Sequence, residues 1–216
     1  MKDRLVYFLS NPLRLIRAVI LKIPYFRFIS ENAENQNPIT LEVWFFQKIL
    51  GYNRGAYWPV HRTSTVNVPS RIYAGIDTSP GLMPGCYIQG HGGIHIGDYT
   101  QIAPNVGIIS ANHDLHDSRK HIHDPVYVGK YCWIGFGAVI LPGVKLGDFT
   151  IVGAGSVVTK SFEKGYCVIA GNPAKEIKQL DDRECHRFKN TNEYNGYIRA
   201  RDFENFSKKL NLLKYE

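Results

Sequence analysis

A repeat of six residues runs through the middle of this chain and constrains its fold more than any other feature. An aliphatic side chain recurs at every sixth position in two runs, which are separated by residues 114–127. The runs are Ile96, Ile102 and Ile108, and then Val128, Ile134, Ile140, Leu146, Val152 and Val158. A glycine directly follows five of these residues. Such a regular spacing predicts a repetitive architecture.

The six-residue period excludes a helix, because a period of 3.6 would scatter these side chains around its axis. An antiparallel barrel or sandwich would need a chain reversal every 8–12 residues, with hairpin dipeptides at the turns. Here the glycine stands at a fixed place beside the aliphatic residue, which indicates a repeated bend. A chain that bends every six residues forms a prism of short parallel strands, with three faces and eighteen residues per coil. Residues 128–163 then make two coils and 96–113 one, and Ile76, Leu82 and Ile88 begin a more degenerate coil.

The repeat also divides the chain. We expect a coiled β domain over residues 70–178, with residues 114–127 extruded as a polar, histidine-rich loop. Residues 1–69 form an N-terminal helical and irregular segment, with one helix between Asn11 and Pro24 and a second from Thr40 to Leu50. Residues 179–216 form a C-terminal helical extension. Its helix, which contains Phe203, Phe206, Leu210 and Leu213, is expected to cap the last coil.

Composition narrows the class of protein. With 44% hydrophobic and 21% charged residues in 216, the chain is an ordinary folded protein of one main domain, not a disordered or collagen-like one. The best apolar run is interrupted by Arg14, Arg17 and Lys22, which argues against a membrane span and against a secretory signal. The four cysteines form no C-x-x-C pair, so neither a disulfide framework nor a zinc ribbon is indicated. We expect a cytoplasmic protein.

The net charge of +7 is concentrated at the front, since residues 1–30 hold six basic side chains against Asp3 alone. One interpretation is peripheral contact with an anionic membrane or a lipid-linked substrate. The simpler interpretation, which the sequence favours, is a helix packed on the domain or at a subunit interface. Nucleic-acid binding is not expected, because the basic residues lack a recognised motif or interleaved stacking aromatics.

The motifs of residues 70–178 resemble the hexapeptide-repeat acyltransferases, and among them the sugar and xenobiotic O-acetyltransferases. The segments that carry the resemblance are Ile102-Ala103-Pro104-Asn105-Val106, Asn112-His113-Asp114, Trp133-Ile134-Gly135, residues 152–160 (VGAGSVVTK) and residues 170–175 (AGNPAK). The stretch from Pro84 to Ile122 is most similar to acetyltransferases of capsule, exopolysaccharide or lipopolysaccharide synthesis. The resemblance implies a mainly β protein, a left-handed parallel β-helix, and a homotrimer with active sites between subunits.

The resemblance also implies the chemistry, which is transfer of an acetyl group from acetyl-CoA to a sugar hydroxyl. A hydroxyl needs a general base at neutral pH, and His113 occupies the position of the family's catalytic histidine. Either Asp114 or a backbone carbonyl could orient the ring. Gln89 lies near the position of the family's catalytic-site asparagine, where an amide would stabilise the oxyanion.

The same resemblance assigns the coenzyme slot to the backbone of Phe136 and Ala154, together with Thr159 and Lys160. Lys160, Lys175 and Lys178 would meet the phosphates of the coenzyme through charge-assisted contacts. For each lysine the alternative is a solvated surface charge. Small residues at the turns would let the extended pantetheine arm approach the backbone.

Other functions remain open at this point. The acceptor is a sugar or polysaccharide precursor by first choice, and a small xenobiotic or an amino-sugar nitrogen by second. A zinc enzyme of the γ-carbonic-anhydrase type is a further alternative, because His116 and His121 have the H-x4-H spacing. It is disfavoured because both lie in the extruded loop, so no metal ligand is assigned. A non-catalytic scaffold is the last alternative, and it predicts no binding of acetyl-CoA.

Overall fold

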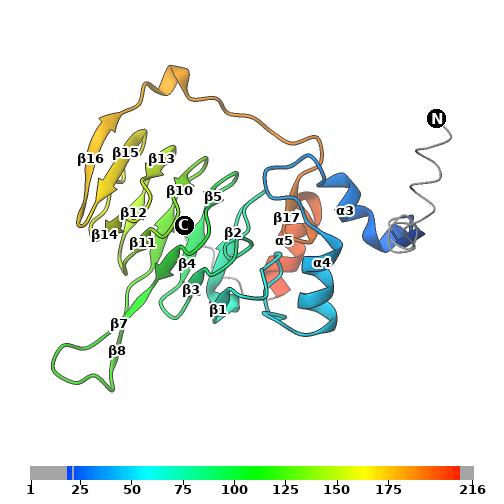
Figure 1. Ribbon diagram of the computed structural model, residues 1–216, viewed down its shortest axis with the longest axis horizontal. Coiled ribbons are helices and arrows are strands. Elements are labelled where there is room, and N and C mark those ends of the chain that lie inside the picture. The colour runs from blue at the N-terminus through cyan, green and yellow to red at the C-terminus, as the bar shows by residue number, and fades with distance from the viewer. Residues whose placement is uncertain (1–18, 21, 210–216) are drawn as a thin grey trace, which may run out of the picture.

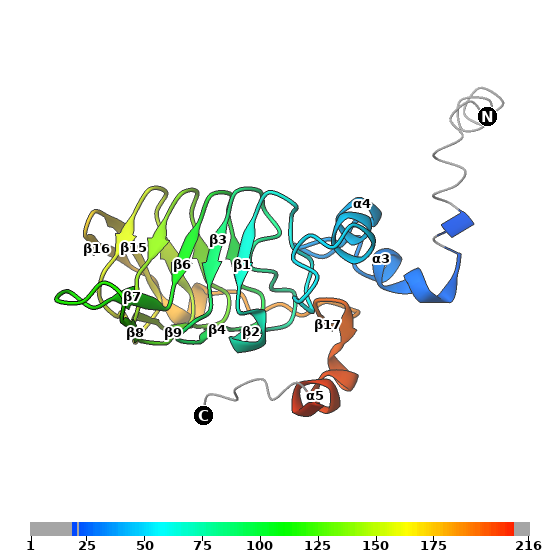
Figure 2. The same cartoon turned by 90° about the horizontal axis from the view of Figure 1, so that it is seen from below.

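The chain forms a three-sided column of short strands, seen from two directions in Figures 1 and 2. The computed structural model describes residues 19, 20 and 22–209. In this part of the chain, sheet A contains β1 (Thr65–Asn67), β3 (Tyr87–Gln89), β6 (Gly107–Ile109), β11 (Val139–Ile140) and β14 (Val157–Val158). Sheet B contains β2 (Ile72–Ala74), β4 (Ile94–Ile96), β9 (Val126–Val128) and β12 (Lys145–Leu146). Sheet C contains β5 (Gln101–Ile102), β10 (Trp133–Ile134), β13 (Thr150–Val152), β15 (Cys167–Gly171) and β16 (Ala174–Gln179).

The strand register confirms the repeat predicted from the sequence. Ile134 pairs in parallel with Val152, and Ile140 pairs with Val158, so residues eighteen apart lie on adjacent coils. All nine aliphatic repeat residues are at most 6% exposed and form one core. In the degenerate first part, Ile88 is fully buried in β3, whereas Ile76 and Leu82 lie outside the strands.

The turns that join the three sheets lie at three corners of the column, and we name each corner by its most distinctive feature. We call the turns between sheets A and B (residues 68–71, 90–93, 110–125, 141–144 and 159–161) the hairpin corner, because a hairpin leaves the column there. The turns between sheets C and A (residues 103–106, 135–138 and 153–156) are the open corner. The turns between sheets B and C (residues 97–100, 129–132, 147–149 and 163–166) are the strap corner.

The strap corner carries a ladder of stacked aromatic rings. Tyr99, Tyr131, Phe149 and Tyr166 occupy equivalent turn positions on four coils, and all have a positive φ of 50–59°. Their ring centroids are 5.2, 4.9 and 5.4 Å apart with nearly parallel planes. This spacing is close to the separation of neighbouring strands, so the turn geometry of each coil places its ring over the next.

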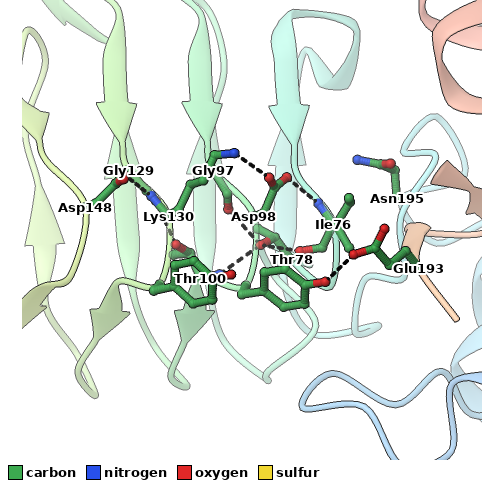
Figure 3. A network of polar contacts seen from close by, with 12 residues as sticks. Ile76, Thr78, Gly97, Asp98, Thr100, Gly129, Lys130, Asp148, Glu193 and Asn195 are labelled. Carbon is green, nitrogen blue, oxygen red and sulfur yellow. Dashed lines mark hydrogen bonds and ion pairs between the residues drawn. The ribbon is translucent and has the colours of Figure 1, made fainter. Parts of the chain in front are cut away.

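Polar side chains join neighbouring coils at the same corner (Figure 3). Asp98 accepts a hydrogen bond from the backbone N–H of Ile76 at 2.9 Å and forms an ion pair with Lys130 at 2.8 Å. One coil further on, Asp148 accepts from the backbone N–H of Lys130 at 2.7 Å. The hydroxyl of Thr100 donates to the carbonyl of Gly129 at 2.8 Å. Backbone groups that a turn would leave without partners are thereby satisfied.

A segment that we call the strap (residues 180–193, with η4 at Asp182–Glu184) runs back along this ladder from the last coil towards the first (Figure 1). The hydroxyl of Tyr131 donates to the carbonyl of Phe188 at 2.9 Å, and the hydroxyl of Tyr99 donates to Glu193 at 2.7 Å. The guanidinium of Arg187 lies 5.1 Å from the ring centroid of Phe149. The strap leads into β17 (Tyr194–Asn195), β18 (Ile198–Arg199) and α5 (Ala200–Lys209).

The expected C-terminal helix is present, but the prediction that it caps the last coil is wrong. The ring of Phe203 in α5 lies 5.2 Å from that of Tyr57 and 6.0 Å from that of Tyr73, which is in the first strand of sheet B. Because the strap is bound along the aromatic ladder, it carries the helix to the opposite end of the column. Leu210 and Leu213 lie outside the described residues.

The N-terminal segment is helical, with η1 (Pro24–Phe26), α3 (Arg27–Glu31), α4 (Leu41–Trp44) and η2 (Phe45–Ile49). The helix predicted over residues 40–50 is confirmed, and the hydroxyl of Thr40 caps it by accepting from the N–H of Val43. Most of the helix predicted before Pro24 lies outside the described residues. No helix in the described part of the chain is long and apolar enough to cross a bilayer.

Candidate functional site

At the hairpin corner the chain leaves the coils in a two-stranded hairpin that protrudes from the column (Figures 1 and 2). Strand β7 (Ala111–His113) pairs antiparallel with β8 (His121–His123), and His113 stands opposite His121. The chain rejoins the column in β9. The departure therefore begins at residue 111, three residues before the predicted loop, because β7 already points away from sheet A.

His113 lies on this hairpin, and its side chain is exposed. Its Nδ1 is 2.5 Å from the carbonyl oxygen of Ser118. A carbonyl can only accept, so Nδ1 must carry the proton, and in the neutral ring the lone pair is on Nε2. Nε2 has no hydrogen-bond partner among the described residues. The geometry thus leaves Nε2 free to take a proton.

Asp114 does not contact the imidazole of His113. Its Oδ1 accepts hydrogen bonds from the backbone N–H groups of His116, at 2.8 Å, and Asp117, at 3.0 Å. These contacts form the turn at the tip of the hairpin. Of the two groups that could orient His113, the structure therefore shows the backbone carbonyl, and Asp114 shapes the loop that presents that carbonyl.

Gln89 lies at the foot of the hairpin, on β3. Its Nε2 donates to the carbonyl of Ala111 at 3.4 Å, and its buried Oε1 has no partner in the described part of the chain. A buried amide oxygen without a donor is uncommon in proteins. The second N–H of the amide remains available, so the predicted oxyanion role is still open.

Further imidazoles and one guanidinium surround the base of the hairpin. The ring of His91 lies 6.4 Å from those of His121 and His123, and the ring of His121 lies 4.5 Å from that of His113. Arg71 donates to the backbone carbonyl of His91 at 2.6 Å. Sequence reasoning overlooked Arg71 because no local motif contains it. Only the stacking of successive turns at one corner could have placed it beside His91.

The two histidines of the zinc alternative lie apart on the hairpin. In the part of the chain that the structure describes, no group of three or more histidine, cysteine or acidic side chains could hold a metal ion. His121 lies in β8, next to other imidazoles, whereas His116 lies in the exposed tip of the hairpin.

The residues assigned to the coenzyme slot fall on both edges of sheet A. Phe136 and Ala154 lie on the open corner, where the N–H of Gly155 donates to the carbonyl of Phe136 at 2.8 Å. The ring of Phe136 is 55% exposed. Gly137 and Gly155 have positive φ, and no atom lies within 4 Å of where a Cβ would be. The open corner therefore offers a smooth wall along which a narrow chain could lie.

The basic candidates are spread over the last coils. Thr159 and Lys160 lie on the hairpin corner, two coils beyond the hairpin, and Lys175 follows the turn into β16. Lys178 lies further along β16, opposite Val168. Within the described residues, none of these three lysines forms an ion pair, and Lys160 lies 5.6 Å from the ring centroid of Phe162.

In a single copy, His113 and the open corner lie on opposite edges of sheet A. His113 is on the hairpin corner, whereas Phe136 and Ala154 are on the open corner. A strand of three residues spans about 10 Å. Several large aromatic side chains around this face are exposed, namely Tyr87, Trp133 and Phe136.

The cysteines offer no nucleophile at this site. Cys132 is 1% exposed and points into the core, and burial raises its pKa to about 12. A thiol with such a pKa is not ionised at neutral pH.

Comparison with known proteins gives a consistent result. Residues 125–160 match the family described as bacterial transferase hexapeptide (six repeats). The galactoside O-acetyltransferase of Escherichia coli (strain K12) is 37% identical over 99 residues, which are 44% of this chain and 48% of that protein. The galactoside O-acetyltransferase of Lactococcus lactis subsp. lactis (strain IL1403) is 33% identical over 95 residues, 42% of this chain and 45% of that protein. The chain thus spans about half the length of the curated relatives it matches.

A solved structure extends the comparison beyond the repeat. The maltose O-acetyltransferase from Clostridium difficile 630 superposes with a TM-score of 0.51 and 26% identity, over 72% of this chain and 89% of that one. The repeat, the column and the matched motifs agree with one another. Over the matched part the chain is similar to the hexapeptide-repeat acyltransferases, and its column is a left-handed parallel β-helix.

Proposed function

We propose that the protein is an acetyl-CoA-dependent O-acetyltransferase that acetylates a sugar hydroxyl, with His113 as the general base. The observation that carries this proposal is the hydrogen bond from Nδ1 of His113 to the carbonyl of Ser118. It fixes the tautomer whose Nε2 can accept a proton. The galactoside and maltose acetyltransferases among the similar proteins support both the reaction and a sugar acceptor.

The reaction is a direct transfer within a ternary complex. The acceptor oxygen attacks the carbonyl carbon of the thioester while its proton passes to Nε2 of His113. The C–S bond then breaks, and the imidazolium returns the proton to the leaving thiolate, which gives an acetyl ester and free CoA. No covalent acetyl-enzyme is required, because the buried thiol of Cys132 is protonated at neutral pH.

Acetyl-CoA would lie along the open corner. The space beside Gly137 and Gly155 fits a narrow pantetheine arm, whose amides could pair with the backbone near Phe136 and Ala154. Lys175 follows the turn after β15, whereas Thr159 and Lys160 lie across sheet A on the hairpin corner and Lys178 lies further along β16, so the phosphates would extend over the last coils. The lysines are free of ion pairs within the described residues, which suits them to phosphate groups.

A complete active site would need two copies of the chain. The base stands on one edge of sheet A and the slot on the other, so one copy cannot bring the two together across the strand. A neighbouring copy placed against sheet A and the open corner would supply the missing half and cover the exposed rings of Tyr87 and Phe136. We therefore propose the homotrimer that the family resemblance implies, with three equivalent sites.

The biological setting is part of the same proposal. The acceptor is a precursor of capsule, exopolysaccharide or lipopolysaccharide, and the alternative is a small xenobiotic or an amino-sugar nitrogen. The enzyme would act in the cytoplasm. The excess of basic residues in 1–30 supports peripheral contact with an anionic membrane, where lipid-linked sugars are found.

Release of free CoA tests the activity. The protein is incubated with acetyl-CoA, a thiol reagent, and a panel of galactosides, maltose, amino sugars and activated sugars. We expect turnover with a sugar hydroxyl, and a rate about 10²- to 10⁴-fold lower in His113→Asn. His116→Asn is the matched control, because this exposed imidazole on the same hairpin has no proposed role. Equal rates in His113→Asn and wild type would remove His113 from the chemistry.

A further inference from the structure

Arg71 is an arginine held in place without a carboxylate to neutralise it. Seven of the nine arginines in the described part of the chain form an ion pair, and the exceptions are Arg54 and Arg71. Arg71 is nevertheless oriented, because its guanidinium donates to the carbonyl of His91 at 2.6 Å. Its other N–H groups have no partner among the described residues.

The acidic side chains of the hairpin are engaged elsewhere. Asp117 pairs with Arg119 at 2.9 Å and with Lys120 at 3.7 Å. Asp114 accepts the backbone N–H groups of the hairpin tip. Asp124 lies against Gly143 on the next coil, where its carboxylate occupies the space that a Cβ would take. Within the described residues, no carboxylate forms an ion pair with Arg71.

A line of polar rings leads from Arg71 to the proposed base. Arg71 and His91 lie on successive turns of the hairpin corner, and the ring of His91 lies 6.4 Å from that of His121. The ring of His121 in turn lies 4.5 Å from that of His113. The half-buried His91, whose backbone carbonyl accepts from Arg71, also lies 6.4 Å from the exposed ring of His123.

We propose that the acceptor sugar carries a phosphate ester, which Arg71 binds together with the imidazole of His91, while a hydroxyl on the far side of the sugar ring reaches His113. A guanidinium with free N–H groups in a fixed orientation suits phosphate oxygens, and an imidazole can add a further donor. His121 lies between the two, 6.4 Å from the ring of His91 and 4.5 Å from that of His113, so phosphate and base would contact different ends of the sugar. This inference rests on the proposed acetyltransferase function and defines its acceptor class.

Acetylation of matched acceptors provides the kinetic test. Galactose, galactose 1-phosphate, UDP-galactose and a short polyprenyl-diphosphate galactose share one sugar and differ in its phosphate. We expect kcat/KM to be at least about tenfold higher for one or more of the phosphorylated acceptors than for galactose. The acceptor with the highest kcat/KM identifies whether the natural acceptor is a nucleotide-linked sugar, a lipid-linked sugar or a free sugar phosphate.

Variants assign that preference to Arg71. In Arg71→Gln the ratio of kcat/KM between the phosphorylated and neutral sugars should fall towards one, and Arg71→Lys should keep part of it. Arg54→Gln is the matched control, since it removes the other arginine without an ion pair, and the ratio should stay at the wild-type value. A ratio near one in the wild type, or an unchanged ratio in Arg71→Gln, would overturn the proposal.

A binding measurement separates this inference from the proposed function. Titration calorimetry of galactose 1-phosphate into the protein without acetyl-CoA requires no turnover. We expect binding to the wild type and to Arg54→Gln, and at least about tenfold weaker binding to Arg71→Gln. Binding of this kind without any acetyl transfer would refute the acetyltransferase and keep the phosphate site. Acetyl transfer to neutral sugars with no binding of galactose 1-phosphate would keep the acetyltransferase function and refute the phosphate site.

Discussion

The strap corner and the hairpin corner are built on the same repeat but differ in what they do with their polar and aromatic groups. At the strap corner, Tyr99 and Tyr131 stack and donate their hydroxyl protons to the strap. At the hairpin corner, His91 and His113 lie close to other imidazoles and keep ring nitrogens that have no hydrogen-bond partner among the described residues. At the strap corner, the stacked side chains are bound by other parts of the chain. At the hairpin corner, several polar side chains have no partner among the described residues.

This difference predicts which substitutions will change the stability of the protein and which will change its turnover. The contacts of the strap fasten the C-terminal extension over the coils and deliver α5 to the first coil. The hairpin contributes little to the core, because only Ala111 in its two strands is buried. Substitutions at the strap corner should therefore change the free energy of unfolding, and substitutions at the hairpin corner should change turnover.

The largest effect on stability is expected for Tyr131→Ala. The change removes a ring from the middle of the ladder and the hydrogen bond to the carbonyl of Phe188. We expect a loss of about 2–4 kcal/mol in the free energy of unfolding, measured by urea denaturation. Tyr131→Phe keeps the stack and loses only the hydrogen bond, so it should cost about 1 kcal/mol.

Turnover is the second measurement on these variants. Because Tyr131 lies away from sheet A, the rate per folded molecule of either variant should stay within about twofold of the wild type. A wild-type unfolding energy in Tyr131→Ala, or a loss of activity in both variants, would contradict the division of roles between the corners.

Lysines on the two sides of the last coil offer the next comparison. Lys160→Gln and Lys175→Gln should each raise the KM for acetyl-CoA by about three- to tenfold and flatten its dependence on salt, because a phosphate contact is lost. Lys164, which lies in a turn of the strap corner, provides the control, and Lys164→Gln should leave both quantities at the wild-type value. Steady-state kinetics at two salt concentrations decide the outcome. A rise in KM that is equal for all three variants would point to a general effect of net charge.

The fold was predictable because the six-residue period leaves one kind of structure that buries every repeat residue. Ile134, Ile140 and Val158 occupy the core positions that the spacing predicts. The strap was not predictable, because residues 180–193 show no period. Their position depends on Tyr99, Tyr131 and Phe149, whose rings come together only when the coils stack. The destination of α5 depends in turn on the strap, so its predicted position on the last coil was wrong.

The candidate site, too, could be predicted only in part from the sequence. His113 could be singled out because it stands in a motif that the family resemblance covers. The carbonyl that orients it belongs to Ser118, and a backbone group leaves no mark in the sequence. Arg71 is twenty residues before His91, and the two meet only because each turn of the hairpin corner lies on the previous one. The three-dimensional stacking of the coils determines these contacts, and local sequence does not encode them.

Substitutions of Asp114 test how the hairpin orients the imidazole of His113. Because its Oδ1 only accepts backbone N–H groups, the neutral amide of Asp114→Asn can form the same turn, and kcat should stay within about threefold of the wild type. Asp114→Ala cannot form the turn, so the carbonyl of Ser118 should be less well placed and kcat should fall further. If the carboxylate itself acted on His113, Asp114→Asn would be as inactive as Asp114→Ala. The comparison of the two kcat values distinguishes these cases.

The smallest expected effect on the free energy of unfolding is that of His95, a histidine on sheet B whose ring packs against its neighbours. Its ring stacks on Tyr73 at 4.5 Å with an interplanar angle of 4°, and burial lowers its pKa, against a smaller upward effect of Asp98. The folded state therefore binds this proton less readily than the unfolded state does. Stability due to the neutral ring is present above the unfolded pKa, about 6.5, and is lost as the pH falls below it.

His95→Phe keeps the stack and removes the proton. The free energy of unfolding, measured at pH 7.5 and pH 5.5, should therefore decrease less for this variant than for the wild type, by about 1 kcal/mol or less. His116→Asn, which removes an exposed histidine from the hairpin, serves as the control and should follow the wild type. An equal decrease in His95→Phe and wild type would mean that the pH dependence arises elsewhere. A decrease that is relieved in His116→Asn would place a titrating contribution to stability on the hairpin, contrary to the contrast between the two corners.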